Sequence, residues 1–183
     1  GMLCADRTVG GMYENYVTPE QCVPDEPLDI PWESCITLGT SFSFVYEDTY
    51  KAPREVICLL VDIVVKGGNL ALNVGPQPDG RLPKGAVESL RGIGEWLAIY
   101  GDAIYGTRPC APYKKDGIGF TQKDQVVYAI QTFAAETDTV SETVWIPYEG
   151  SVQKITALDT GAELSFESKN GGYLVTAEPW TGD

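Results

Sequence analysis

Acidic and aromatic side chains gather in the first 35 residues, in sequence rich in turn-forming residues. Glu14, Glu20 and Glu33 lie in this stretch, Arg7 precedes them, and Trp32 directly precedes Glu33. Carboxyl groups flanked by aromatic side chains are typical of glycoside hydrolysis, in which one acid protonates the leaving oxygen while the other attacks or activates water. Many loops contain such residues, so this pattern alone gives weak support for that chemistry.

The remaining composition narrows the available chemistry. The chain contains no histidine, which excludes Ser–His and Cys–His nucleophilic pairs and most zinc sites. Its five cysteines are scattered and never follow Cys-x-x-Cys spacing, so they predict neither a metal site nor a disulfide framework. We therefore expect no cofactor and no metal, and proton transfer would depend on carboxyl groups.

Charge and hydropathy also limit the partners. The net charge is −13, from 26 acidic and 13 basic residues, and such a surface repels phosphate backbones. The apolar run at residues 56–65 is too short to cross a bilayer and is interrupted by Asp62. We expect neither nucleic acid nor a membrane as a partner.

The acidic cluster needs elements to position it, and residues 1 to about 108 alternate between strand-like and helix-like patterns. Apolar side chains at helical spacing predict helices over residues 53–66 and 83–100. Strands are expected at residues 2–5, 35–40, 69–74 and 103–106. This alternation with short connections indicates parallel β/α units, with too few strands to close an eight-stranded barrel.

The pattern changes after the Pro-Cys-Ala-Pro sequence at residues 109–112. Short alternating segments follow at the spacing of a β-sandwich, with a strong hairpin signal at Asn170-Gly171. The expected strands are residues 117–121, 125–133, 143–147, 152–158, 163–167 and 173–177. We place a domain boundary near Arg108, which gives domains 1–108 and 109–183, and we expect the sandwich to lack its last strand.

Three ordered blocks of sequence span most of residues 5–108. The first comprises Asp-Arg-Thr-Val-Gly-Gly at 6–11, Tyr-Glu-Asn-Tyr-x-Thr-Pro-Glu-Gln at 13–21 and Pro-Trp-Glu-Ser-Cys-x-Thr at 31–37. The second is Val-Asp-Ile-Val-x-Lys-Gly-Gly-Asn-Leu-x-Leu-Asn-Val-Gly-Pro at 61–76, with Asp-Gly at 79–80. The third is Ile-Gly-Glu-Trp-Leu at 93–97, followed by Gly-x-Ala-Ile-Tyr-Gly-Thr-Arg at 101–108. Together these blocks resemble the α-L-fucosidases of glycoside hydrolase family 29.

The resemblance implies a retaining hydrolase that removes terminal α-L-fucose from fucosylated oligosaccharides or glycoconjugates. It implies a (β/α)8 TIM-like catalytic barrel followed by an antiparallel β-sandwich, of which this chain would hold barrel strands 5–8 and the sandwich. The family's aspartate nucleophile and sugar-binding histidines belong to earlier strands, so we expect the isolated chain to be inactive. Family habit suggests a periplasmic, secreted or lysosomal protein.

The same resemblance implies a catalytic role for one glutamate. Glu20, within Thr-Pro-Glu, matches the position of the general acid/base. The acid/base aligns poorly between subgroups of the family, so Glu14 and Glu33 remain rivals. A structural alternative is that Glu20 caps a short helix.

Substrate contacts are implied at three further positions. Arg7 matches an arginine that contacts the fucose or holds the nucleophile, and Phe42 matches an aromatic residue that lines the methyl side of the sugar. Trp32 is a further candidate for substrate binding. As alternatives, Arg7 would serve a structural ion pair, and the two aromatic residues would belong to the core or to the wall of the site.

Two other functions stay open. In the first alternative, the chain is a non-catalytic module that binds glycans or a partner chain. Alternatively, its half-barrel would associate through exposed sheet edges, either with a second copy or with a separate N-terminal fragment.

Overall fold

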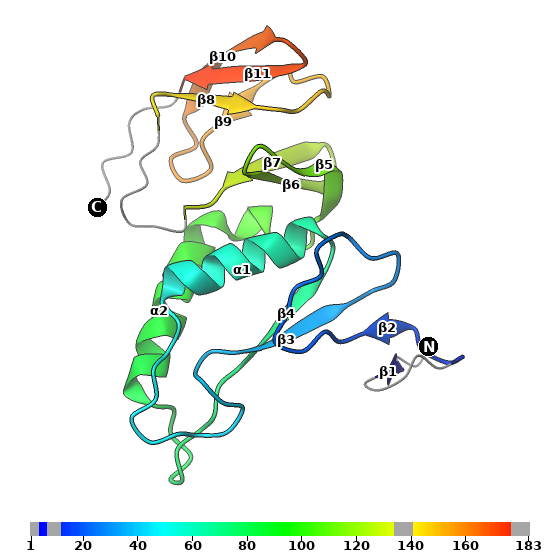
Figure 1. Ribbon diagram of the computed structural model, residues 1–183. Helices are drawn as coiled ribbons and strands as arrows, with labels where there is room; N and C mark the ends of the chain where they lie inside the picture. Colours follow the sequence, from blue (N-terminus) through cyan, green and yellow to red (C-terminus); the bar gives the residue numbers. More distant parts are fainter. Residues whose placement is uncertain (1–3, 7–11, 134–140, 177–183) are drawn as a thin grey trace.

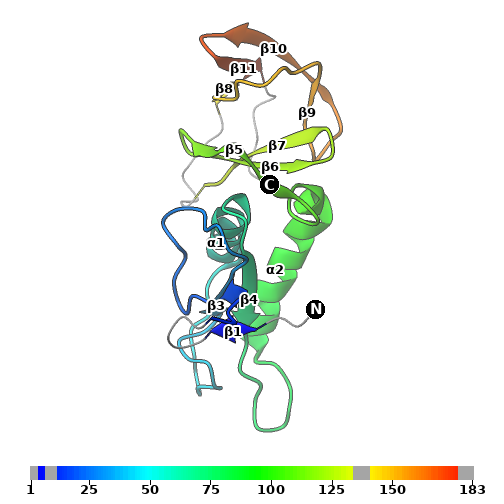
Figure 2. The same ribbon diagram turned by 90° about the vertical axis from the view of Figure 1, so that its right-hand side faces the viewer.

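The computed structural model describes residues 4–6, 12–133 and 141–176 (Figure 1). Parallel strands with two helices form one part of the molecule, and two antiparallel sheets form the other. Helix α1 lies between the parallel strands and the antiparallel sheets in both views (Figures 1 and 2).

Four short strands run parallel in the order in which the chain visits them. They are β1 (Ala5–Asp6), β2 (Tyr16–Val17), β3 (Glu33–Thr37) and β4 (Asn69–Asn73). β1 pairs with β2, and β3 pairs with β4. Isolated parallel bridges from Val17 to Trp32 and from Glu20 to Cys35 connect the β2 segment to β3. The described residues therefore form an open parallel array and no closed barrel.

Helices α1 (Pro53–Val65) and α2 (Lys84–Tyr100) agree with the predicted helices to within one residue at each end. Pro53 suits the first turn of α1 because its missing N–H would have no intrahelical partner there. Gly67 follows the helix at φ +84°, a backbone conformation that glycine adopts without a steric penalty. The apolar faces of both helices then pack on one side of β4. This core contains Leu38, Val56, Ala86, Ile93, Leu70 and Leu72.

The strand predictions for this part were only partly correct. The predicted strand at 103–106 is wrong, because the 3-10 turn η1 (Gly101–Ala103) continues the helix and the N–H groups of Ile104 and Tyr105 both donate to the Gly101 carbonyl. The prediction at 69–74 is confirmed by β4. β3 begins two residues before the predicted 35–40 and ends at Thr37. Of the predicted strand 2–5, only its last two residues are described, and β1 starts at Ala5.

The segments from β1 to β2 and from β2 to β3 contain no helix among their described residues. β2 itself escaped prediction, because its two residues lie within a polar stretch without visible alternation.

The second part consists of two antiparallel sheets. One sheet has the order β5-β6-β7, and the other has the order β8-β11-β10-β9. Their strands are β5 (Arg108–Lys115), β6 (Ile118–Lys123), β7 (Val126–Gln131), β8 (Thr143–Ile146), β9 (Ile155–Thr156), β10 (Glu163–Lys169) and β11 (Gly172–Thr176). Side chains of the first sheet pack against those of β8 to form one core, which contains Cys110, Ile118, Phe120, Val144 and Ile146. The arrangement is consistent with a β-sandwich.

Each of the six predicted antiparallel segments overlaps an observed strand, although the segment at 152–158 is reduced to Ile155–Thr156. The hairpin at Asn170-Gly171 is confirmed, with both residues at positive φ between the paired Lys169 and Gly172. β5 was missed because Pro109 and Pro112 indicated a boundary rather than a strand. β5 lies at the edge of its sheet, where proline is tolerated because an outward N–H is not needed for pairing.

The two parts are in close contact. Val61 and Val65 of α1 pack with Ile104 and with Ile130 of β7. A Cβ atom at Gly119 of β6 would lie 2.7 Å from the Val65 side chain, so glycine permits this close approach. In Figure 2, β5, β6 and β7 lie directly over α1, with the remaining sheet beyond them.

Candidate active site

The pairing of the parallel strands decides which face each candidate occupies. Glu20 pairs with Cys35, and successive side chains along a strand point to opposite faces. Glu20 therefore shares the face of Cys35 and Glu33, whereas Trp32 shares the opposite face with Ile36. Ile36 pairs with Leu72, which packs in the core against the helices. Glu20 and Glu33 thus lie on the strand face that α1 and α2 leave uncovered.

Glu20 occupies the end of its strand segment. The Cys35 N–H donates to the Pro19 carbonyl at 2.9 Å, and the Gln21 N–H donates to the Cys35 carbonyl at 2.9 Å. Gln21 then adopts φ 55° and ends the strand. The Glu20 side chain is exposed, and the structure shows no helix there for it to cap.

The two rival glutamates have different surroundings. Glu33 is half-buried at the start of β3, where it pairs with Asn69 of β4. Glu14 is half-buried in the segment before β2. The carboxyl ends of parallel strands are where β/α enzymes bind substrates, and of the three glutamates it is Glu20 that occupies such an end.

The predicted substrate-binding residues fall in three different settings. Phe42 is 40% exposed on the loop that follows β3. Trp32 is 1% exposed, and its ring lies against Gly68 so closely that a Cβ atom there would be 2.5 Å from the indole. Arg7 lies outside the described residues. The position of Phe42 is open to a ligand, whereas Trp32 packs inside the protein.

The loop that carries Phe42 is held by Asp48. The Asp48 carboxylate accepts hydrogen bonds from the Thr40 hydroxyl at 2.6 Å and from the Thr40 N–H at 3.2 Å. The hydroxyl bond is the largest cause of a lowered pKa of Asp48. On the other side of the loop, Gly75 allows the backbone of Phe44 to approach closely. These contacts give the loop a defined position beside the strand ends.

Two polar side chains near the site were missing from the predicted set. Thr18 and Asn73 each carry a buried oxygen that has no hydrogen-bond partner among the described residues. Asn73 pairs with Thr37 at the end of β4, and Thr18 lies two residues before Glu20 on the same face. For Asn73, the alternation of residues along β4 was a signal that could have identified it. The stretch around Thr18 has no such pattern.

In chemical terms, the site offers an exposed carboxyl group at a strand end and an exposed aromatic side chain on the adjoining loop. A carboxylic acid in this position can donate a proton to the oxygen of a leaving group. Aromatic side chains supply an apolar surface for one part of a ligand.

Comparisons with known proteins agree on one family. The sequence model of the family described as Alpha-L-fucosidase matches residues 1–102. An alpha-L-fucosidase from Branchiostoma floridae is 31% identical over 186 residues, which cover 98% of this chain and 40% of the relative. The tissue alpha-L-fucosidase of Homo sapiens is 32% identical over 167 residues, with 87% and 34% coverage.

Solved structures show the same similarity. Alpha-L-fucosidase isoenzyme 1 from Paenibacillus thiaminolyticus superimposes with a TM-score of 0.80 at 29% identity, over 90% of this chain and 41% of that protein. The Thermotoga maritima alpha-fucosidase in complex with fucose superimposes with a TM-score of 0.78 at 31% identity, over 95% and 40%. The chain thus spans about two fifths of the length of these solved structures.

Proposed function

Because the chain belongs to the α-L-fucosidase family, glycoside hydrolase family 29, we propose that it supplies the acid/base side of an active site that releases terminal α-L-fucose from glycans. The observation that carries this proposal is the place of Glu20, which is exposed at the end of a parallel strand on the uncovered face. Fucosylated oligosaccharides or glycoconjugates are the proposed substrates.

In the proposed reaction, Glu20 donates its proton to the glycosidic oxygen while a second carboxylate, outside this chain, attacks the anomeric carbon. Glu20 then removes a proton from the water that breaks the covalent intermediate, so the configuration of the sugar is retained. Glu14 and Glu33 are the rival acids. Glu33 shares the uncovered face with Glu20 and is the stronger of these two rivals.

For substrate binding we propose direct sugar contacts for Arg7 and Phe42. Phe42 supports this role by its exposure on a loop beside the strand ends. Trp32 is only 1% exposed, so its proposed contribution to sugar binding is indirect, through its support of the adjoining strand β3.

For the domain organisation we propose a boundary near Arg108. Residues 1–108 would form the C-terminal half of a (β/α)8-like barrel, whose remaining strands would complete the open parallel array. Residues 109–183 would form the sandwich. A retaining site needs two carboxyl groups about 5 Å apart, so the isolated chain would not turn over substrate.

The experiment joins this chain to the part of the Thermotoga maritima enzyme that it does not cover. We expect the fusion to release nitrophenol from nitrophenyl α-L-fucoside and the isolated 183-residue chain to release none. Turnover by the isolated chain would contradict the proposed division of the site.

The general acid is then identified by how the loss of activity on its substitution depends on the leaving group of the substrate. Glu20→Gln in the fusion should lower kcat/KM, which reports the step that forms the covalent intermediate, about 10²–10⁴-fold for an alkyl fucoside. The loss should be much smaller for a dinitrophenyl fucoside, because that leaving group departs without a proton. Matched Glu14→Gln and Glu33→Gln variants should lose similar activity on both substrates. If either variant instead lost far more activity on the alkyl fucoside, the role of general acid would belong to that glutamate.

A further inference from the structure

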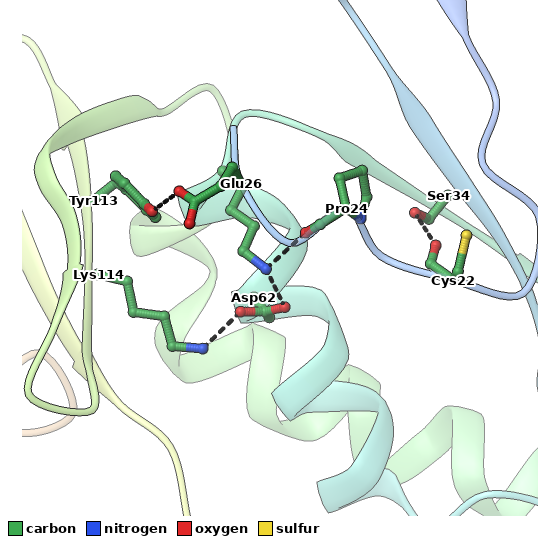
Figure 3. A network of polar contacts seen from close by, with 8 residues as sticks. Cys22, Pro24, Glu26, Ser34, Asp62, Tyr113 and Lys114 are labelled. Carbon is green, nitrogen blue, oxygen red and sulfur yellow. Dashed lines mark hydrogen bonds and ion pairs between the residues drawn. The ribbon is translucent and has the colours of Figure 1, made fainter. Parts of the chain in front are cut away.

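The chain segment that directly follows Glu20 is held by side chains from three different elements (Figure 3). The four contacts join Gln21 to Thr37, Cys22 to Ser34, Pro24 to Lys66, and Glu26 to Tyr113. The first two partners belong to β3, Lys66 caps α1, and Tyr113 belongs to β5. The antiparallel part of the molecule therefore contacts the candidate active-site segment.

Lys66 is the central residue of this network. Its side chain is only 8% exposed, and its ammonium group donates to the Pro24 carbonyl at 2.9 Å and to Asp62 Oδ2 at 2.8 Å. A buried charge is costly unless an opposite charge or hydrogen bonds compensate it. Asp62 therefore makes it possible for Lys66 to reach the Pro24 carbonyl as a cation.

Asp62 also contacts the antiparallel sheet. Its other oxygen, Oδ1, accepts a hydrogen bond from Lys114 Nζ of β5 at 2.7 Å. One carboxylate thus lies between two ammonium groups, one from α1 and one from β5. This gives a continuous path of polar contacts from Lys114 through Asp62 and Lys66 to Pro24.

The backbone of β5 is adapted to make both contacts. Adjacent residues of a regular strand point to opposite faces, yet Tyr113 and Lys114 both reach toward α1 and the segment before it (Figure 3). The pairing of β5 with β6 shifts register between Pro109 and Lys114, and Tyr113 has φ 44°. Left-handed backbone at a tyrosine is uncommon. Lys115, next along the strand, pairs instead with Glu149 within the antiparallel part.

We infer that β5 is a positioning element of the active site. Tyr113, through Glu26, and Lys114, through Asp62 and Lys66, hold residues 22–26 and thereby fix the strand end that carries Glu20. Tyr113, Lys114, Asp62 and Lys66 are positioning residues, not catalytic ones. The inference rests on the proposed function for the role of Glu20, but the contacts themselves can be tested without it.

The first test uses the 183-residue chain and hydrogen–deuterium exchange measured by mass spectrometry. Lys114→Met and Tyr113→Phe should each make the amides of residues 19–26 exchange about tenfold faster, because each removes one contact that opposes local opening. Lys115→Met is the matched control on the same strand and should leave that exchange unchanged. Equal exchange in all three variants and the unsubstituted chain would overturn the inference.

The second test uses the active fusion. Lys114→Met should lower kcat about tenfold and leave KM within about twofold, since a misplaced acid impairs the chemical step more than binding. Lys114→Arg, which keeps the charge, should recover most of the loss, and Lys115→Met should match the unsubstituted fusion. An unchanged kcat in Lys114→Met would count against positioning. If Glu20→Gln kept full activity, the proposed function would fail, while the exchange result would still decide whether β5 holds the segment.

Discussion

The side-chain amide of Gln21 binds Thr37 at two points. Its Nε2 donates to the Thr37 hydroxyl at 3.1 Å, and its Oε1 accepts the Thr37 N–H at 3.2 Å. Thr37 is the last residue of β3, and Gln21 directly follows Glu20. The end of β3 therefore holds the residue next to the candidate acid by both its backbone and its side chain.

Replacing Gln21 by Leu should destabilise the chain by about 1–2 kcal/mol, because it removes both bonds and leaves a buried N–H of Thr37 without its acceptor. Urea unfolding monitored by circular dichroism measures the change. Gln122→Leu is the control, since Gln122 is exposed and makes one bond to the Asp124 carbonyl. Equal midpoints for the two variants would contradict the prediction.

Replacing Asp62 by Asn should change the free energy of unfolding by an amount that depends on pH. Desolvation by burial raises the pKa of Asp62, but hydrogen bonds from Lys114 and Lys66 outweigh it and hold the pKa below its ordinary value of 3.8. The stabilisation by the ionised form is therefore present above about pH 4 and is lost as pH falls through the lowered pKa.

At pH 7 we expect Asp62→Asn to lower the unfolding free energy by about 1–3 kcal/mol, since Lys66 loses its counter-ion. The difference between the two proteins should shrink below about pH 4, as Asp62 becomes neutral in the unsubstituted chain. Unfolding free energies measured from pH 7 to pH 2 test this, and a difference independent of pH would refute the role of the charge.

Replacing Gly68 by Ala should be destabilising, by about 1–3 kcal/mol. The new methyl group would lie 2.5 Å from three atoms of the Trp32 ring, which is 1% exposed. Gly94→Ala in α2 is the matched control. It meets no atom within 4 Å and should stabilise the helix by up to about 1 kcal/mol. We expect the melting temperature to fall for Gly68→Ala and to rise for Gly94→Ala. An unchanged melting temperature for Gly68→Ala would show that the Trp32 ring can shift to make room for a methyl group.

Replacing Thr121 by Val should weaken the junction between the two parts. Thr121 is fully buried in β6, and its hydroxyl donates to the Ala103 carbonyl at 2.7 Å. Valine keeps the volume and removes this bond, at a cost of about 1–2 kcal/mol. The exposed Thr156→Val in β9 serves as the control. Thermal unfolding compares the two, and similar melting temperatures would mean that the junction does not depend on this bond.

Local sequence patterns predicted the elements that carry a strong periodic signal. Helix α1 was predicted because apolar residues such as Val56 and Ile63 recur at helical spacing after Pro53. The hairpin at Asn170-Gly171 was predicted because few residues adopt positive φ at two successive positions. β2, by contrast, is too short for a pattern, and the prolines of β5 concealed an edge strand.

In the candidate site too, the sequence predicted some features and not others. The sequence identified Glu20, Glu33 and Phe42 as residues of interest, but it placed Trp32 beside them without regard to the face on which it lies. Only the pairing of Val17 with Trp32 and of Glu20 with Cys35 separates the two faces. A one-residue change of register would exchange them.

The sequence by itself determined the family, the helices and the acidic cluster around Glu20, because these depend on residue types and on spacing within a few turns of chain. The tertiary structure alone decided that Glu20 occupies a strand end, that Trp32 is buried against Gly68, and that Lys114 contacts Asp62 across 52 positions of sequence. Contacts of this kind depend on strand register and on the packing of distant elements. No local pattern of residues encodes them.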